Sequence, residues 1–222
     1  MRKREAAHQL SSEEVEVGPW ELNGILEIPS DARGLVLFVH GSGSSRLSPR
    51  NRYVAGVLNR AGIGTLLFDL LRDEEAEDRN NVFDIPLLAE RLEGAAEWVN
   101  RQPRADGLAL GYFGASTGAA AALVAAARRP DRVDAVVSRG GRPDLAGDWL
   151  ERVEAPTLLL VGGYDEAVIR MNQDALKRLR SVKDLVVIPG ATHLFAEPGT
   201  LEEVARLAAE WFHRYLGARP SA

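Results

Sequence analysis

Residues 108–118 read LALGYFGASTG, and the segment AAAALVAAA follows at 119–127. The first stretch is a short apolar run that favours a buried strand, and the second is rich in alanine, the strongest helix former. Between them stands the pattern G-x-S-x-G, with Gly114 and Gly118 on either side of Ser116. Glycines at both flanks relieve crowding in a sharp turn, so that the serine hydroxyl stands exposed. The sequence therefore predicts a nucleophile elbow at Ser116.

Apolar runs of the same kind recur along the chain. They predict five more buried parallel strands, at 35–39, 64–68, 133–137, 157–161 and 185–188. Residues 13–28 alternate apolar and polar side chains around Gly18-Pro19, which predicts a β-hairpin. Helical periodicity occupies the intervening segments 50–61, 85–101, 117–128, 168–180 and 200–216. We expect an α/β fold, a three-layer sandwich around a mostly parallel eight-stranded sheet.

The length and the polar ends predict a single domain. A chain of 222 residues can bury a sizeable core without metals or disulfides, and no linker, repeat or low-complexity tract divides it. We expect a disordered tail over 1–12, one domain over 13–217 and a C-terminal tail over 218–222.

Composition excludes several kinds of function. The 27 basic and 32 acidic residues give a net charge of −5, which argues against a nucleic-acid partner. The absence of cysteine rules out disulfides, cysteine-bound zinc and a thiol nucleophile. No apolar run is long enough to span a membrane, and the polar segment SSEEVEVG stands where a secretion signal needs apolar residues. We expect a cytoplasmic monomer or small homo-oligomer that acts on a small molecule.

Two later residues are candidates to activate the serine. A serine nucleophile needs a base to take its proton, and the base needs an acid to orient it. Asp165 follows the apolar strand TLLLVGG, and His193 follows LVVIPGAT. The carboxyl ends of parallel strands meet at one edge of the sheet, which would bring both near Ser116. The alternatives are a surface turn or helix cap for Asp165 and a solvated loop for His193.

The stretch His40-Gly41-Ser42-Gly43 ends the strand at 35–39. In a fold with a nucleophile elbow, this loop supplies one backbone N–H to the oxyanion hole, and the residue after the nucleophile supplies the other. We assign these donors to Ser42 and Thr117, with Gly43 as the alternative to Ser42. We expect His40 to brace the loop.

Four motifs carry a resemblance to a known family: HGSG at 40–43, GASTG at 114–118, VGGYD at 161–165 and GATHLF at 190–195. The chain resembles the α/β-hydrolase superfamily, and within it the small lidless enzymes of the dienelactone hydrolase family. It is also similar to hydrolase domains that are sometimes fused to phosphoribosyltransferases. One departure is that the namesake enzyme uses a cysteine nucleophile where this chain has Ser116, so its cyclic substrate is not carried over.

The resemblance implies ester hydrolysis through an acyl-enzyme. Ser116 would attack the carbonyl, His193 would move the proton, and Asp165 would hold the imidazole, with no metal or organic cofactor. The same triad would serve a thioesterase, lactonase, amidase, perhydrolase or acyltransferase, and a non-catalytic binding protein of this fold is a further alternative. Fewer than 20 residues separate the strands that end at 137 and begin at 157, which leaves no room for a lid domain. We therefore expect an open site that prefers short acyl esters.

Two further segments have alternative interpretations. The stretch SRGGRPD at 138–144 follows a predicted strand, so Arg139 or Arg142 could bind a substrate carboxylate; the alternative is an ion pair with Asp144 or with the acidic segment at 73–78. The acidic loop LRDEEAEDRNNVFD at 71–84 follows a strand end, where ligands bind. It could hold a divalent cation or, as we favour, form a solvated mobile rim.

Overall fold

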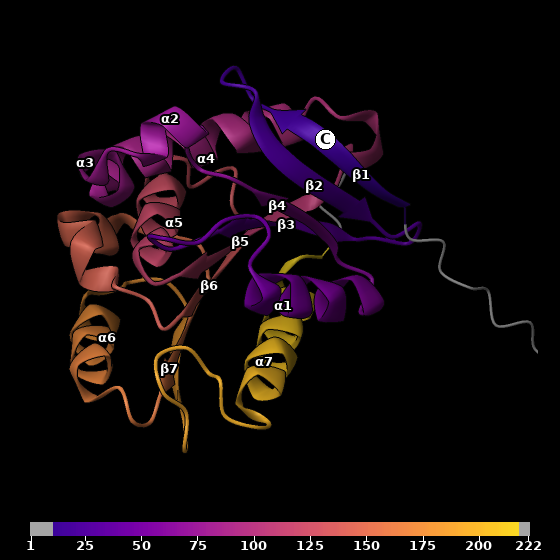
Figure 1. The fold of residues 1–222 in the computed structure, drawn as a ribbon. Helices are drawn as coiled ribbons and strands as arrows, with labels where there is room; N and C mark the ends of the chain where they lie inside the picture. Colours follow the sequence, from indigo (N-terminus) through magenta and orange to yellow (C-terminus); the bar gives the residue numbers. More distant parts are fainter. Residues whose placement is uncertain (1–10, 218–222) are drawn as a thin grey trace, which may run out of the picture.

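The computed structural model describes residues 11–217, in which an eight-stranded sheet lies between two layers of helices (Figure 1). The strand order is β1-β2-β4-β3-β5-β6-β7-β8. The first two strands pair antiparallel, β2 is also antiparallel to β4, and all other neighbours are parallel. This is the predicted α/β sandwich. Its strands are β1 (Ser11–Val17), β2 (Leu22–Ile28), β3 (Gly34–Val39), β4 (Gly64–Phe68), β5 (Ala109–Ala115), β6 (Ala135–Arg139), β7 (Thr157–Gly162) and β8 (Lys183–Ile188).

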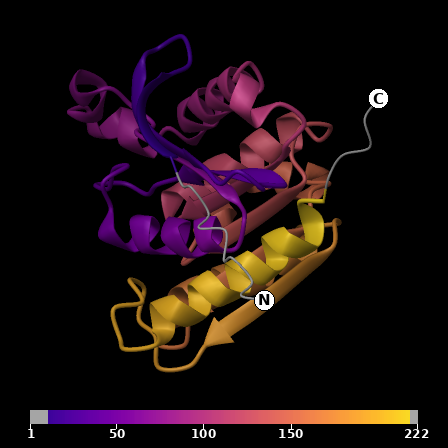
Figure 2. The same cartoon turned by 90° about the vertical axis from the view of Figure 1, so that its right-hand side faces the viewer.

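Helices cover both faces of the sheet. One face carries α1 and α7, which lie side by side, and the other carries α4, α5 and α6 (Figures 1 and 2). The α-helices are α1 (Pro49–Arg60), α2 (Asp73–Ala76), α3 (Arg79–Phe83), α4 (Ile85–Val99), α5 (Thr117–Arg128), α6 (Glu166–Arg178) and α7 (Thr200–Tyr215), with 3-10 segments η1 (Pro103–Ala105) and η2 (Pro143–Arg152). The five predicted helices are confirmed, with ends that differ by up to two residues. No helix in the described part of the chain is long and apolar enough to cross a membrane.

Burial on both faces explains the unbroken apolar runs. In β5, Tyr112 packs in the core beneath α4 and α5, while Phe113 packs in the core beneath α1 and α7. Successive residues of a strand point to opposite faces, so a sheet covered on both sides needs apolar residues at every position. At the edge of the sheet β1 is largely exposed, and its sequence alternates accordingly.

Strand ends differ from the expected ranges by up to two residues, and two of these differences change an assignment. β1 begins at Ser11, so Ser11 and Ser12 belong to the domain and not to the tail; residues 1–10 and 218–222 lie outside the described part of the chain. β6 spans Ala135–Arg139 instead of 133–137. The reason is that the Asp134 carboxylate accepts a hydrogen bond from the backbone N–H of Leu110 at 2.8 Å, which sets the start of the β5–β6 pairing. Arg139 therefore lies inside the strand.

The acidic segment at 71–84 is not a loop without structure. It contains α2 and α3, and its acidic residues start helices. Asp78 accepts a hydrogen bond from Asn80 N–H at the start of α3, and Asp84 accepts one from Leu87 N–H at the start of α4. Carboxylates at helix N-termini satisfy free N–H groups and favour the helix dipole. The segment is therefore solvent-exposed over most of its length and lines the pocket, as expected, but it forms two short helices instead of a loop. Its mobility stays a prediction.

A half-buried histidine joins the carboxyl ends of β3 and β4. His40 lies 3.0 Å from the carbonyl oxygen of Gly41 through Nδ1, and its Nε2 accepts a hydrogen bond from Leu70 N–H at 3.1 Å. A ring that accepts through Nε2 and donates through Nδ1 is the neutral tautomer. Burial lowers the pKa of His40 below its usual 6.5, against smaller raising effects of the Gly41 hydrogen bond and the Asp69 charge. His40 braces the loop, as expected.

The lowered pKa of His40 predicts a loss of stability in acid. As the pH falls below 6.5, the His40 ring binds a proton in the unfolded chain before it does so in the folded chain, so acid favours unfolding. Above pH 6.5 the neutral ring makes its full contribution to the free energy of unfolding. In urea unfolding between about pH 7 and pH 5, the wild type should lose more stability than His40→Gln. His213→Gln, which changes an exposed histidine, should keep the wild-type slope. Equal slopes for wild type and His40→Gln would contradict the assignment.

Candidate active site

Ser116 occupies a strained turn between β5 and α5. Its φ of 51° and ψ of −122° lie in a region that non-glycine residues rarely adopt and that costs about 1–3 kcal/mol. A Cβ on Gly118 would stand 2.2 Å from the carbonyl oxygen of Val39, and one on Gly114 would stand 2.4 Å from Ala119 Cα. Only glycine permits these approaches. The elbow predicted from the motif is thus present in the backbone.

The end of β6 holds the elbow in place. Ser116 N–H donates to the carbonyl oxygen of Arg139 at 3.3 Å, and Arg142 N–H donates to the carbonyl oxygen of Ser116 at 3.0 Å. These two bonds hold the Ser116 N–H against β6 and the Ser116 carbonyl against the turn at Arg142. Together with the contact of Gly118 with β3, they fix the position of the nucleophile.

Asp165 and His193 form a close pair. His193 Nδ1 lies 2.6 Å from Asp165 Oδ2, and the two side chains are 40% and 16% exposed. Asp165 stands at the N-cap of α6, yet its carboxylate makes no cap hydrogen bond and turns to the histidine instead. The structure thus brings together the predicted acid and base. In the part of the chain that the structure describes, no hydrogen bond joins Ser116 Oγ to His193; such bonds are often long before substrate binds.

The predicted oxyanion loop packs against the elbow. A Cβ on Gly41 would stand 2.9 Å from Ser116 Cβ, and Ser42 N–H donates to Thr117 Oγ1 at 3.0 Å. The structure therefore places Ser42 beside Thr117, and their role as oxyanion donors stays a prediction. The Thr117 hydroxyl already accepts the Ser42 N–H, so an oxyanion would have to share or replace that bond.

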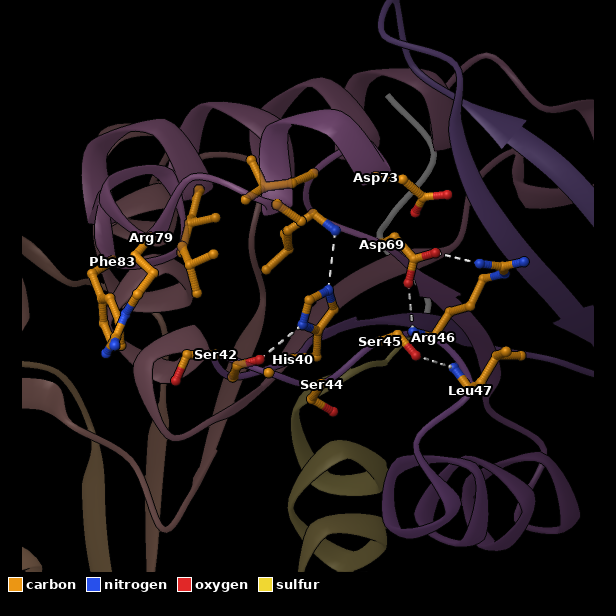
Figure 3. A pocket seen from close by; sticks show the side chains of 17 residues that line it. His40, Ser42, Ser44, Ser45, Arg46, Leu47, Asp69, Asp73, Arg79 and Phe83 are labelled. Atoms are coloured by element: carbon orange, nitrogen blue, oxygen red, sulfur yellow. Dashed lines mark hydrogen bonds and ion pairs between the residues drawn. The ribbon is translucent and has the colours of Figure 1, made fainter.

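A pocket of about 630 Å³ opens beside this loop (Figure 3). Residues 40–47 form one wall, and α3 and the start of α4 form another. Arg46 pairs with Asp69 across it through both backbone and side chain. Arg79 lies over the ring of Phe83, 5.9 Å from its centroid, and both side chains reach from α3 toward Ser42 in Figure 3.

The α2–α3 segment is anchored by a buried arginine. Arg91 of α4 pairs with Glu75 of α2 at 2.7 Å and stacks on the ring of Trp20 at 4.0 Å. The sequence did not indicate Arg79 or Phe83 as pocket residues. Asp78, a typical helix-capping residue, could have indicated the short helix α3. The position of α3 in the pocket wall could not be predicted, because it depends on the contact of Glu75 with Arg91.

Within residues 11–217, no three acidic or histidine side chains are grouped to hold a metal ion, so the cation interpretation of this segment has no support.

The two candidate arginines differ in environment. Arg142 makes the ion pair with Asp144 that we considered, with Nε–Oδ1 at 2.9 Å and Nη2–Oδ2 at 2.7 Å. Arg139 is only 9% exposed and has no carboxylate partner in the described part of the chain. Burial, with a smaller effect of the Arg50 charge, lowers the pKa of Arg139 to about 10. A substrate role for either residue stays a prediction.

Comparison with known proteins agrees with this architecture. The model of the dienelactone hydrolase family matches residues 70–216. A crystal structure of dienelactone hydrolase from Anabaena variabilis is 60% identical, with a TM-score of 0.89 over 94% of this chain and 99% of that chain. Est1E from Butyrivibrio proteoclasticus has a TM-score of 0.76 over 91% of this chain and 98% of that chain; at 18% identity, this shows the fold alone.

Two curated proteins of Mycobacterium tuberculosis, named "Putative phosphoribosyl transferase", are 59% identical over 215 residues. The match covers 96% of this chain but 48% of theirs, so the chain spans about half the length of these relatives. Family and fold place the chain among hydrolases. The matched region includes the elbow, the Asp165–His193 pair and the α3 wall of the pocket. On this match, the chain belongs to the dienelactone hydrolase family.

Proposed function

We propose that the chain is a serine hydrolase that cleaves short-chain carboxylic esters through an acyl-enzyme on Ser116. The observation that carries this proposal is the 2.6 Å contact between Asp165 and His193 at the sheet edge where the elbow presents Ser116. A carboxylate on Nδ1 leaves Nε2 as the ring nitrogen that can take the serine proton.

The reaction would proceed in two steps. Ser116 Oγ attacks the ester carbonyl as His193 Nε2 accepts its proton, and the same imidazolium protonates the leaving alcohol. Water then attacks the acyl-enzyme, again with His193 as base. The N–H groups of Thr117 and Ser42 would hold the oxyanion, and one such donor is worth about 3–4 kcal/mol of barrier.

The pocket lining supports a short acyl group. Arg46, Asp69, Asp73 and Arg79 line the cavity beside the oxyanion loop, among apolar residues such as Leu47, Leu70, Val82, Phe83 and Leu88. The charged groups interrupt the apolar part of the lining, so a long hydrocarbon chain would have to cross groups that need water or a hydrogen bond, which is costly. The connection between β6 and β7 holds only the 3-10 segment η2, so it contributes no lid domain.

Other acyl transfers use the same intermediate. Thioesterase, lactonase, amidase, perhydrolase and acyltransferase activities remain alternatives. Cleavage of a carboxylic ester bond, open or cyclic, is favoured over amide or thioester cleavage by the family match and by the hydrolase name of the Anabaena protein. The transferase name of the longer Mycobacterium proteins concerns whole proteins of which this chain matches half.

A fluorophosphonate probe tests the nucleophile. The wild type should be labelled, Ser116→Ala should not, and Asp165→Asn should be labelled about 10³-fold or more slowly because the imidazole loses its orienting carboxylate. Ser30→Ala is the matched control, since it removes an exposed hydroxyl that does not line the pocket and should label normally. Gel fluorescence and peptide mapping provide the measurement. An unlabelled wild type would favour the non-catalytic binding protein and reject the proposal.

The acyl preference is tested with p-nitrophenyl esters of increasing chain length. We expect kcat/KM to peak at acetate or butyrate and to fall for longer chains, because a long hydrocarbon chain would have to cross the charged groups in the pocket lining. Arg79→Leu should move the optimum toward longer chains if this wall sets the limit. A maximum at ten carbons or more in the wild type would contradict the short-chain assignment.

A further inference from the structure

We propose that Asn172 of α6 is a positioning residue for the oxyanion hole, which acts on the Thr117 N–H through a chain of two peptide groups. The inference rests on the proposed function, since it concerns how the same site stabilises its transition state. Asn172 does not touch the substrate. Its side-chain amide holds the two peptide groups in one orientation, and the second of them carries the Thr117 N–H.

Asn172 is a polar residue at a fully buried position. Its side chain is 0% exposed, and it lies in the interior of α6, where asparagine is a weaker helix former than alanine or leucine. Its Oδ1 is inaccessible and has no hydrogen-bond partner in the described part of the chain. A buried acceptor without a donor is costly, and an apolar side chain would avoid that cost. The value of an amide at this position therefore lies in its donors.

The amide nitrogen of Asn172 holds the turn that follows β6. Its Nδ2 donates to the carbonyl oxygen of Val168 at 2.8 Å, within the same helix, and to the carbonyl oxygen of Gly141 at 3.0 Å. A side-chain amide nitrogen carries two hydrogens, so these bonds use both of them. The first bond fixes the side chain to its own helix, and the second fixes the Gly141 carbonyl to α6.

The Gly141 carbonyl and the Arg142 N–H belong to one peptide group. A trans peptide is planar, and its C=O and N–H point in opposite directions, so a bond that orients the carbonyl also orients the N–H. The Arg142 N–H donates to the carbonyl oxygen of Ser116 at 3.0 Å. That carbonyl shares its peptide group with the N–H of Thr117, the predicted oxyanion donor. Two hydrogen bonds and two rigid peptide groups thus join Asn172 to the oxyanion hole.

The turn is packed closely against the helix that carries Thr117. A Cβ on Gly141 would stand 2.6 Å from the Cβ of Ala119, so glycine lets this peptide approach the first turn of α5. The Ser116 carbonyl accepts a second bond from the Ala119 N–H at 3.1 Å, within α5. The Arg142 N–H adds a hold from outside the helix. Without Asn172 this outer hold is weakened next to a serine whose φ of 51° is strained.

The chain also strengthens its last donor. Hydrogen bonds in series polarise one another, so a donor on the Gly141 carbonyl makes the Arg142 N–H a stronger donor, and the next bond does the same for Thr117. Thr117 is the first residue of α5, a position where the N–H has no acceptor within its own helix. Its N–H is free to bind an oxyanion, which develops only in the transition state. Asn172 therefore affects the barrier and not the binding of the ground state.

The test compares the wild type with Asn172→Leu, which replaces the amide by an apolar side chain of similar size. With p-nitrophenyl acetate, kcat should fall about 10- to 100-fold while KM stays within about twofold, because the weakened interaction exists only in the transition state. A trifluoromethyl ketone forms a tetrahedral adduct with an active-site serine and so mimics the oxyanion. Its inhibition constant should rise by the same factor as kcat falls.

Two further variants separate positioning from stability. Ala175→Gly weakens α6 about one turn beyond Asn172 and leaves the amide in place, so its thermal midpoint should fall while kcat stays at the wild-type value. Asn172→Ser keeps the test valid if Asn172→Leu folds poorly. Its hydroxyl has a single proton, which the Val168 carbonyl takes, so Gly141 loses its donor and kcat should fall as in Asn172→Leu.

The outcomes also separate this role from an effect on the histidine. The turn touches the catalytic loop, since a Cβ on Gly140 would stand 3.2 Å from the carbonyl oxygen of His193. If Asn172 acted through His193, the acid limb of the pH profile of kcat/KM would shift in the Asn172 variants. Such a shift would overturn the oxyanion assignment, and so would unchanged binding of the trifluoromethyl ketone.

Failure of the proposed function gives a different result. A wild type that hydrolyses the ester and is labelled by the fluorophosphonate, with both Asn172 variants equal to it in kcat, rejects the positioning role alone. A wild type that neither hydrolyses the ester nor is labelled rejects the hydrolase, and the role of Asn172 with it.

Discussion

The close approach of α5 to β3 is the constraint on which the site depends. Gly118 lies so near the carbonyl oxygen of Val39 that no side chain fits between them, and this contact places the helix start directly behind Ser116. The backbone accepts strain at the serine because the hydrogen bonds to Arg139 and Arg142 hold both sides of it. The strained turn presents the half-buried Ser116 side chain at the sheet edge.

Charged side chains around this edge differ in whether they have a partner. Asp165 orients a histidine and Asp69 holds Arg46, so two of the acidic groups that face the site have specific partners. Asp78 and Asp84 start the helices α3 and α4, which line the pocket. Arg139 is buried without a carboxylate partner in the described part of the chain.

Much of the fold and the core of the site could be predicted from the sequence, because they depend on local patterns. Apolar runs identified the buried strands, and the glycines around Ser116 required a tight turn whatever surrounded it. The start of β6 could not be predicted, since it depends on the Asp134 side chain bonding to a different strand. The pairing of Arg91 with Glu75 was equally inaccessible, because it depends on how α2 packs against α4.

The central claim is that Ser116 forms an acyl-enzyme, and intact-mass spectrometry after rapid mixing with p-nitrophenyl acetate tests it most directly. The account predicts a burst of p-nitrophenol and a transient protein species heavier by one acetyl group, with the acetyl mapped to the peptide that contains Ser116. The same adduct should accumulate when deacylation is slowed in acid. Hydrolysis without any acetylated species in acid, or an adduct that persists in Ser116→Ala, would contradict the account.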